Sequence, residues 1–154
     1  MSRVRYMLDT NTVSYFLKQH PVVTEKLLAV PISALCISAI TEGELLFGIA
    51  KRPEATNLGR AVREFLRRVA VLPWDSTVTE LYGTVRADLE AKGRTLAPLD
   101  LLIGTHAWAV GAVLVSSDQV FSQIEDLNLQ DWTQVDQPKA DATQQTKKRG
   151  LKND

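Results

Sequence analysis

Short apolar runs alternate with longer amphipathic segments along the first 132 residues. The short runs have the length and apolar character of strands, whereas the longer segments repeat apolar residues at helical spacing. Strands are predicted at residues 4–8, 34–37, 69–72, 112–115 and 127–132. Helices are predicted at residues 12–18, 22–30, 39–50, 55–68, 76–92 and 98–109, with a short one after residue 118. This alternation predicts an α/β fold with a parallel sheet and right-handed crossovers.

Residues 137–154 lack this periodicity and consist mostly of polar and charged residues. We predict that they form a disordered or weakly ordered tail, which leaves residues 1–136 as one domain. The tail holds five basic and two acidic residues, and the rest of the chain holds 13 basic and 16 acidic residues. A slightly acidic domain does not suit binding of long nucleic acid by bulk charge, so any nucleic acid has to be held over a restricted area.

Several features predict a cytoplasmic protein without a membrane partner. No apolar run has the length that crosses a bilayer, and Met1-Ser2-Arg3 leads directly into the first predicted strand rather than into a signal peptide. The single cysteine, Cys36, lies among apolar neighbours, where we expect a reduced and buried thiol.

Acidic residues occupy unusual places in this pattern. Asp9 directly follows the first strand, where open α/β sheets bind their ligands, and Asp118 follows the strand at residues 112–115. Asp100 lies in an otherwise apolar helix start, where an unpartnered carboxylate is costly. Simpler interpretations exist, because Asp9 is also suited to cap a helix and Asp100 to interact with a helix N-terminus.

A further acid comes from the helix at residues 39–50. Glu42 and Glu44 are two positions apart and cannot share a helix face, and Glu44 is the one near the apolar side. Carboxylates that converge without a basic partner repel one another unless a divalent cation neutralises them, and oxygen ligands favour Mg²⁺ or Mn²⁺ over zinc. His20, before a proline, and His106, on an apolar helix, do not fit a zinc site. We therefore expect a metal site suited to phosphodiester hydrolysis.

Four segments occur in an order and spacing that are typical of one family. They are Met7-Leu8-Asp9-Thr10-Asn11, Ile37-Ser38-Ala39-Ile40-Thr41-Glu42-Gly43-Glu44-Leu45, Pro98-Leu99-Asp100-Leu101-Leu102-Ile103 and Leu114-Val115-Ser116-Ser117-Asp118. Over residues 4–133 the sequence therefore resembles the PIN-domain family, and within it the VapC-like toxins of bacterial toxin–antitoxin pairs.

This resemblance implies a PIN-like α/β/α sandwich around a parallel sheet of about five strands. It implies a Mg²⁺- or Mn²⁺-dependent endoribonuclease that acts as a toxin and hydrolyses RNA such as transfer RNA. It also implies a small antitoxin as partner, and a homodimer or a larger toxin–antitoxin assembly.

The resemblance assigns roles to particular residues. Four acids are implied as catalytic and metal-binding: Asp9, Glu44, Asp100 and Asp118. Asn11 is expected to brace Asp9, and Ser116 to orient the acidic site. Ser117 stands where the family often has asparagine or another small residue, and we expect little effect.

Basic residues gather on the helix at residues 55–68 and just before it. These candidates for the RNA approach are Lys51, Arg52, Arg60, Arg63, Arg67 and Arg68. A solvated helix surface or an antitoxin contact explains them equally well. A PIN-fold module that binds a partner with weak or no catalysis is the alternative function, and the complete set of four acids favours the enzyme. An acid-loop phosphatase is disfavoured, because Asn11 stands where such enzymes need a second aspartate.

Overall fold

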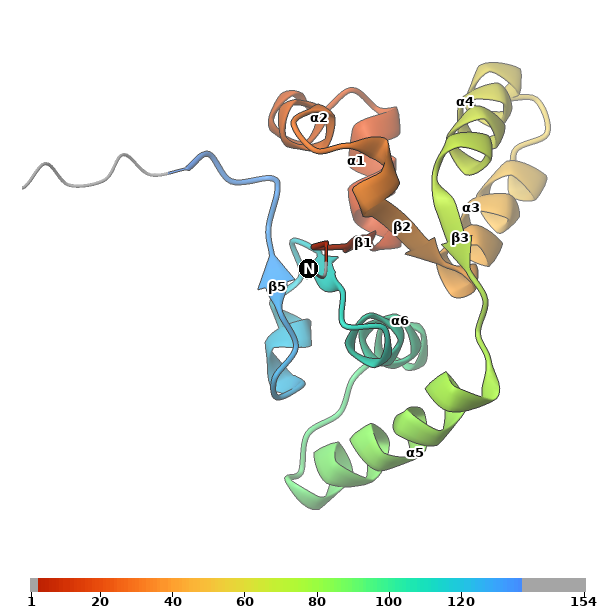
Figure 1. The fold of residues 1–154 in the computed structure, drawn as a ribbon. Coiled ribbons are helices and arrows are strands. Elements are labelled where there is room, and N and C mark those ends of the chain that lie inside the picture. Colours follow the sequence, from red (N-terminus) through yellow and green to blue (C-terminus); the bar gives the residue numbers. More distant parts are fainter. Residues whose placement is uncertain (1–2, 137–154) are drawn as a thin grey trace, which may run out of the picture.

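The computed structural model describes residues 3–136, which form a parallel sheet between two layers of helices (Figure 1). The strands follow the order β3-β2-β1-β4-β5, and every pairing is parallel. Their bounds are β1 Tyr6–Leu8, β2 Leu35–Ser38, β3 Ala70–Leu72, β4 Val113–Val115 and β5 Leu129–Gln130. The expected α/β/α sandwich is confirmed, whereas the tail predicted at residues 137–154 lies outside the described residues.

The α-helices occur where the apolar periodicity predicts them. Their bounds are α1 Thr10–Leu17, α2 Pro21–Leu28, α3 Ala39–Lys51, α4 Thr56–Arg68, α5 Ser76–Ala91 and α6 Pro98–Ala109. Gly93 follows α5 with φ +67°, a conformation that glycine adopts without strain, and so ends that helix as expected. Short 3₁₀ helices at Ile32–Ala34 and Gln119–Gln123 complete the described chain. Within residues 3–136, no helix has the length and apolar character that crossing a membrane requires.

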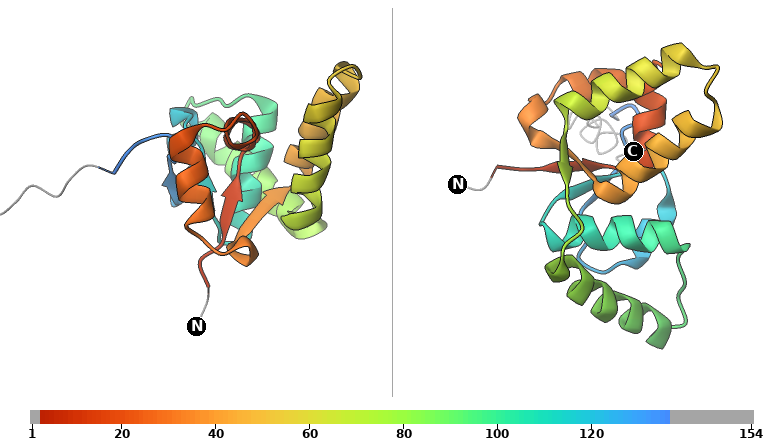
Figure 2. Two further views of the ribbon diagram at one scale, coloured as in Figure 1. Left: turned by 90° about the horizontal axis from the view of Figure 1, so that it is seen from above. Right: turned by 90° about the vertical axis from the view of Figure 1, so that its right-hand side faces the viewer.

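The sheet is covered on both faces, which explains why its central strands are mostly apolar and buried. Leu8 and Ile37 pack into a core with side chains of α1, α2 and α4. Met7 and Leu114 point to the other face and pack with α6. Helix α5 lies outside α6 as a further layer (Figures 1 and 2).

Parallel pairing places the carboxyl ends of the strands along one edge of the sheet. The central strand β1 lies between β2 and β4, so the segments that follow these three strands are neighbours at that edge. Asp9 follows β1, α3 follows β2, and Asp118 lies shortly after β4. The topology therefore brings together acids that are more than 100 positions apart in the sequence.

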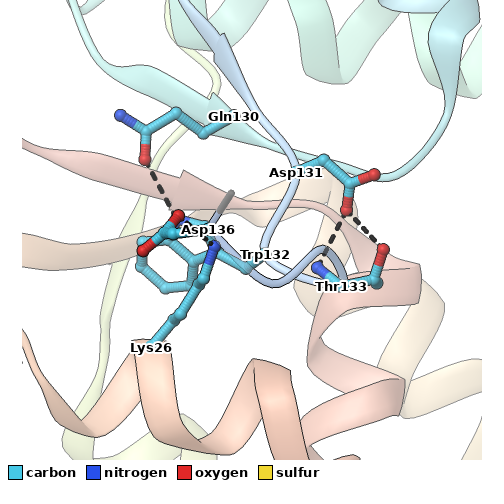
Figure 3. A network of polar contacts seen from close by, with 6 residues as sticks. All are labelled: Lys26, Gln130, Asp131, Trp132, Thr133 and Asp136. Atoms are coloured by element: carbon cyan, nitrogen blue, oxygen red, sulfur yellow. Dashed lines mark hydrogen bonds and ion pairs between the residues drawn. The ribbon is translucent and has the colours of Figure 1, made fainter. Parts of the chain in front are cut away.

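The end of the described chain is fixed against helix α2 (Figure 3). The Lys26 Nζ lies 3.1 Å from the Asp136 Oδ1, and the indole N–H of Trp132 donates to the Gln130 Oε1 at 3.0 Å. Trp132 is 5% exposed and packs on Tyr6 with ring centroids 5.3 Å apart. These contacts hold the edge strand β5, which is the last strand that the sequence predicts.

Candidate active site

Asp9 is buried where the central strand ends. Its backbone N–H donates to the carbonyl of Val115 at 3.1 Å, and its Oδ1 accepts a hydrogen bond from the Thr12 N–H at 2.8 Å. The side chain of Ser116 opposes the rise in the pKa of this carboxylate that burial causes. Asp9 therefore caps helix α1 and also presents a carboxylate at the ligand-binding edge of the sheet. The helix cap and the site carboxylate are thus compatible interpretations of this residue.

A cavity of about 220 Å³ lies beside Asp9. It is lined by Asp9, Thr10, Asn11, Glu44, Ala97, Leu99, Asp100 and Ile103. Three predicted acids, from the end of β1, from α3 and from α6, thus meet at one cavity. The Thr10 hydroxyl donates to the Glu44 Oε1 at 3.1 Å, whereas Glu42, which is half-buried rather than fully solvated, lies outside the lining. Of the two glutamates, Glu44 is thus the one that lines the cavity.

Asp118 does not line the cavity, but it lies close enough to affect the carboxylates there electrostatically. Its negative charge raises the pKa of both Asp9 and Asp100, after the larger effect of burial. Asp118 is exposed, and its Oδ1 accepts from the Val120 N–H at 3.0 Å. Its backbone N–H donates to the Ser116 Oγ at 3.0 Å. Ser116 thus contacts the backbone of Asp118 and affects the pKa of Asp9, and the orienting role expected of it stays a prediction.

Among the described residues, the Thr12 N–H donates to the Asp9 carboxylate, and the side chain of Ser116 affects its pKa. Asn11 is exposed and lines the cavity. The contact with Asp9 that was expected of Asn11 is made by a neighbouring residue instead. Sequence reasoning missed Thr10 and Thr12 as supporting residues. The signal was present, because small hydroxyl residues beside an acid at a helix start commonly form such local hydrogen bonds.

The acids disfavour ionisation of one another. Burial raises the pKa of Asp9, Glu44 and Asp100 above their ordinary values. Asp100 and Asp9 add to the effect on Glu44 through their negative charge. Among the described residues, neither lysine nor arginine lines the cavity. A divalent cation would remove the repulsion.

The chemistry of this donor set fits a hard divalent cation, since the acids offer oxygen atoms alone. Within residues 3–136, no three His, Cys, Asp or Glu side chains stand close enough to hold an ion as they are placed. If these acids bind an ion, their side chains would have to rotate toward it. Neither histidine lines the cavity: the His20 Nδ1 accepts from the Val23 N–H at 3.2 Å, and His106 is fully buried.

Replacement of Asp100 by asparagine is expected to raise the melting temperature by a few degrees at pH 7 in EDTA. A carboxyl group whose pKa is raised on folding stabilises the protein below its unfolded-state pKa, and this contribution is lost as the pH rises through the folded-state pKa. At pH 7 the charged Asp100 therefore opposes folding, and asparagine removes the charge. Differential scanning fluorimetry from pH 4 to 8 measures the effect, which should shrink toward pH 4.

Saturating Mn²⁺ should reduce or reverse the difference in melting temperature between Asp100→Asn and the wild type, because a cation that binds the folded wild-type chain stabilises it. Glu80→Gln removes one negative charge from an exposed position of α5 and serves as the control. A melting temperature of Asp100→Asn at or below that of the wild type, at pH 7 in EDTA, would contradict the assigned electrostatics.

The predicted basic residues lie apart from the cavity. All of them are exposed, at the end of α3, in the following turn and along α4, and none belongs to the cavity lining among the described residues. Arg67 and Arg68 pair with Glu64, with N–O distances of 3.2 and 2.8 Å. Because Arg68 also borders an apolar groove, a partner contact is favoured for it. Arg60 and Arg63 remain candidates for RNA contact.

This groove, of about 480 Å³, lies between helices α1 and α2 on one side and α4 on the other. Its apolar lining includes Phe16, Leu17, Leu27, Leu28, Val30, Ile32, Leu35, Phe65 and Val69. Leu28 is 71% exposed and Ile32 is 52% exposed. Exposed apolar side chains that gather in a groove are typical of an interaction surface.

The sheet order and the acids at its carboxyl edge define a PIN domain, and the chain belongs to the PIN domain family, which it matches over residues 6–127. The tRNA(fMet)-specific endonuclease VapC of Salmonella typhimurium is 32% identical over 130 residues, which cover 84% of this chain and 98% of the relative. Ribonuclease VapC1 of Haemophilus influenzae is 34% identical over 131 residues, with 83% and 98% covered. The crystal structure of DNA-bound VapBC from Salmonella typhimurium matches with a TM-score of 0.78 and 32% identity, covering 84% of this chain and 99% of that chain.

Proposed function

We propose that the protein is a Mg²⁺- or Mn²⁺-dependent endoribonuclease and the toxin of a toxin–antitoxin pair. The observation that carries this proposal is the meeting of Asp9, Glu44 and Asp100 at one cavity, with Asp118 in electrostatic reach. Relatives named as ribonucleases and as a tRNA(fMet)-specific endonuclease support RNA, and transfer RNA in particular, as the substrate. Transfer RNA is a cytoplasmic molecule, so we place the protein in the cytoplasm.

The four acids would hold the cation, which supplies a Lewis acid that activates water and neutralises charge developing on the phosphate. The protein positions these acids with hydrogen bonds. Thr10 orients Glu44, and Thr12 orients Asp9. The buried Ile103 forms an apolar part of the cavity wall, where electrostatic interactions are stronger than in water.

Purified protein is expected to cleave transfer RNA in Mg²⁺ or Mn²⁺ and to stop when EDTA removes the ion. Denaturing gels with mapped product ends would follow initiator transfer RNA, an elongator transfer RNA and a ribosomal RNA fragment. Readdition of the metal in excess should restore cleavage. If no RNA is cleaved with either metal, the nuclease proposal is wrong, and a PIN-fold module that only binds a partner becomes the better interpretation.

We propose that the antitoxin docks in the apolar groove between α1, α2 and α4. Leu28 and Ile32 offer exposed apolar contacts, and Arg68 with Glu64 forms a charged border. This combination of an apolar centre and a polar border is usual for protein interfaces. The similar VapBC structures from Salmonella typhimurium and Rickettsia felis support a partner of this kind.

We further propose that the protein forms a homodimer. Besides the groove, Leu46 and Phe47 on α3 and Leu99 on α6 are exposed, at 37%, 66% and 47% respectively. They lie on the helices that carry Glu44 and Asp100, so a second copy bound there would border the active-site cavity. Light scattering of the purified protein measures the oligomeric state directly.

A further inference from the structure

A buried polar contact joins helices α3 and α6 away from the cavity. Ser38 ends strand β2 and caps α3, and both Ser38 and His106 of α6 are 0% exposed. The Ser38 Oγ and the His106 Nδ1 are hydrogen-bonded at 2.7 Å. The same Oγ accepts from the Ile40 N–H at 3.1 Å, which starts α3. A fully buried hydrogen bond between such distant positions fixes the approach of the two elements closely, because breaking it leaves polar groups unsatisfied.

The same two helices meet again at the active site. Glu44 lies six positions after Ser38, Asp100 lies six positions before His106, and both acids line one cavity. Because Glu44 follows Ser38 whereas Asp100 precedes His106, α3 and α6 run in opposite directions. Six residues span about 9 Å along a helix. Measured along the helix axes, the Ser38–His106 hydrogen bond therefore lies about 9 Å from Glu44 in α3 and about 9 Å from Asp100 in α6. Both carboxylates lie in the same direction from this hydrogen bond.

His106 is held from a second direction. Its ring packs edge-on against Trp74, with centroids 5.5 Å apart and an interplanar angle of 77°. Trp74 belongs to the segment after β3, and its indole N–H donates to the Thr79 Oγ1 at 2.8 Å. The His106 Nε2 has no hydrogen-bond partner among the described residues. The contact with Ser38 is therefore the polar anchor of this ring, and the packing on Trp74 keeps the ring in place.

We propose that Ser38 and His106 are positioning residues that fix the separation of Glu44 and Asp100 and thereby set the affinity for the divalent cation. This inference rests on the proposed function, because it requires that these acids hold a cation. Neither residue belongs to the cavity lining. Hydrogen-bond partners behind metal ligands commonly change metal affinity by about 10–100-fold.

Two substitutions of His106 separate positioning from packing. His106→Phe keeps the ring and its contact with Trp74 but removes Nδ1, so Mn²⁺ affinity should fall about tenfold. The melting temperature should also fall, because the buried Ser38 hydroxyl loses its partner. His106→Asn places an amide near the position of Nδ1 and leaves a small void, so the melting temperature should fall while the affinity stays within about twofold. Isothermal titration calorimetry measures the affinity without reference to activity.

Ser38→Gly tests the other side of the contact. Glycine is an acceptable helix cap, so α3 still begins there, but the hydroxyl partner of His106 is lost. We expect the same loss of Mn²⁺ affinity, about tenfold, as in His106→Phe. Val23→Ala, on the buried face of α2, is the control, since it should lower stability and leave Mn²⁺ affinity unchanged.

The outcomes distinguish this inference from the proposed function. If the wild-type protein binds Mn²⁺ and cleaves RNA, but His106→Phe and Ser38→Gly bind Mn²⁺ as the wild type does, the positioning role is wrong and the nuclease stands. If His106→Asn loses as much affinity as His106→Phe, packing rather than the hydrogen bond is responsible. If the wild-type protein neither binds Mn²⁺ nor cleaves any RNA, both proposals fail.

Discussion

RNA cleavage by Asp9→Asn is expected to fall by more than about 100-fold, which exceeds the usual effect of losing a residue behind a metal ligand. Asparagine caps helices as well as aspartate does and can still accept the hydrogen bond from the Thr12 N–H. The substitution therefore removes the ligand charge and leaves the start of α1 intact. Initial rates on transfer RNA, with circular dichroism to confirm folding, measure the effect.

Asp88→Asn is the matched control, because Asp88 lies on the exposed surface of α5 and pairs only with Lys92, at 2.9 Å, among the described residues. Its cleavage rate should equal that of the wild type. Wild-type activity in Asp9→Asn would show that the site is misassigned. Equal cleavage in all three preparations that persists in EDTA would instead point to a contaminating ribonuclease that needs no metal.

Leu28→Lys is expected to weaken antitoxin binding by more than about tenfold while RNA cleavage by the free protein is unchanged. Leu28 is 71% exposed in the groove, so the substitution leaves the core intact but places a charge where an apolar partner surface would be buried. Leu28 does not line the acidic cavity. Calorimetry with the co-purified antitoxin, beside a cleavage assay, separates binding from catalysis.

Val135→Lys provides the comparison, because Val135 is similarly exposed, at 73%, and lies outside the groove. This variant should bind the antitoxin as the wild type does. Unchanged affinity in Leu28→Lys would move the docking surface elsewhere on the molecule. Loss of cleavage in Leu28→Lys would instead connect the groove to the active site.

The strands and helices were predictable because each buries an apolar face of regular period. The run at residues 34–37 is apolar at every position, which is typical of a strand covered on both sides, and the structure has β2 at Leu35–Ser38. The turn at Ile32–Ala34 was not predicted, since three residues are too few to show a period. The strand order was also beyond prediction, because it depends on which long-range contacts form.

The acids were predictable from the cost of placing carboxylates at strand ends and in apolar helices. Their supporting hydrogen bonds were not, because they depend on side-chain directions that only the folded chain defines. Thr10 reaches across to Glu44, 34 positions away, and Ser38 reaches His106, 68 positions away. The assignment of Asn11 as the brace of Asp9 shows the same limit, since the contact is made by Thr12, one position further on.

Because β1 is the central strand, the acids of the candidate site differ in how easily they can move. The Asp9 N–H donates to the Val115 carbonyl of β4, and the Asp9 carbonyl accepts from the Val13 N–H at the start of α1, so displacing Asp9 would disturb both the sheet and that helix. Asp118, in contrast, is exposed and caps only a short 3₁₀ helix. If these acids hold an ion as proposed, drawing them together would cost least by moving Asp118 toward Asp9 rather than by moving Asp9.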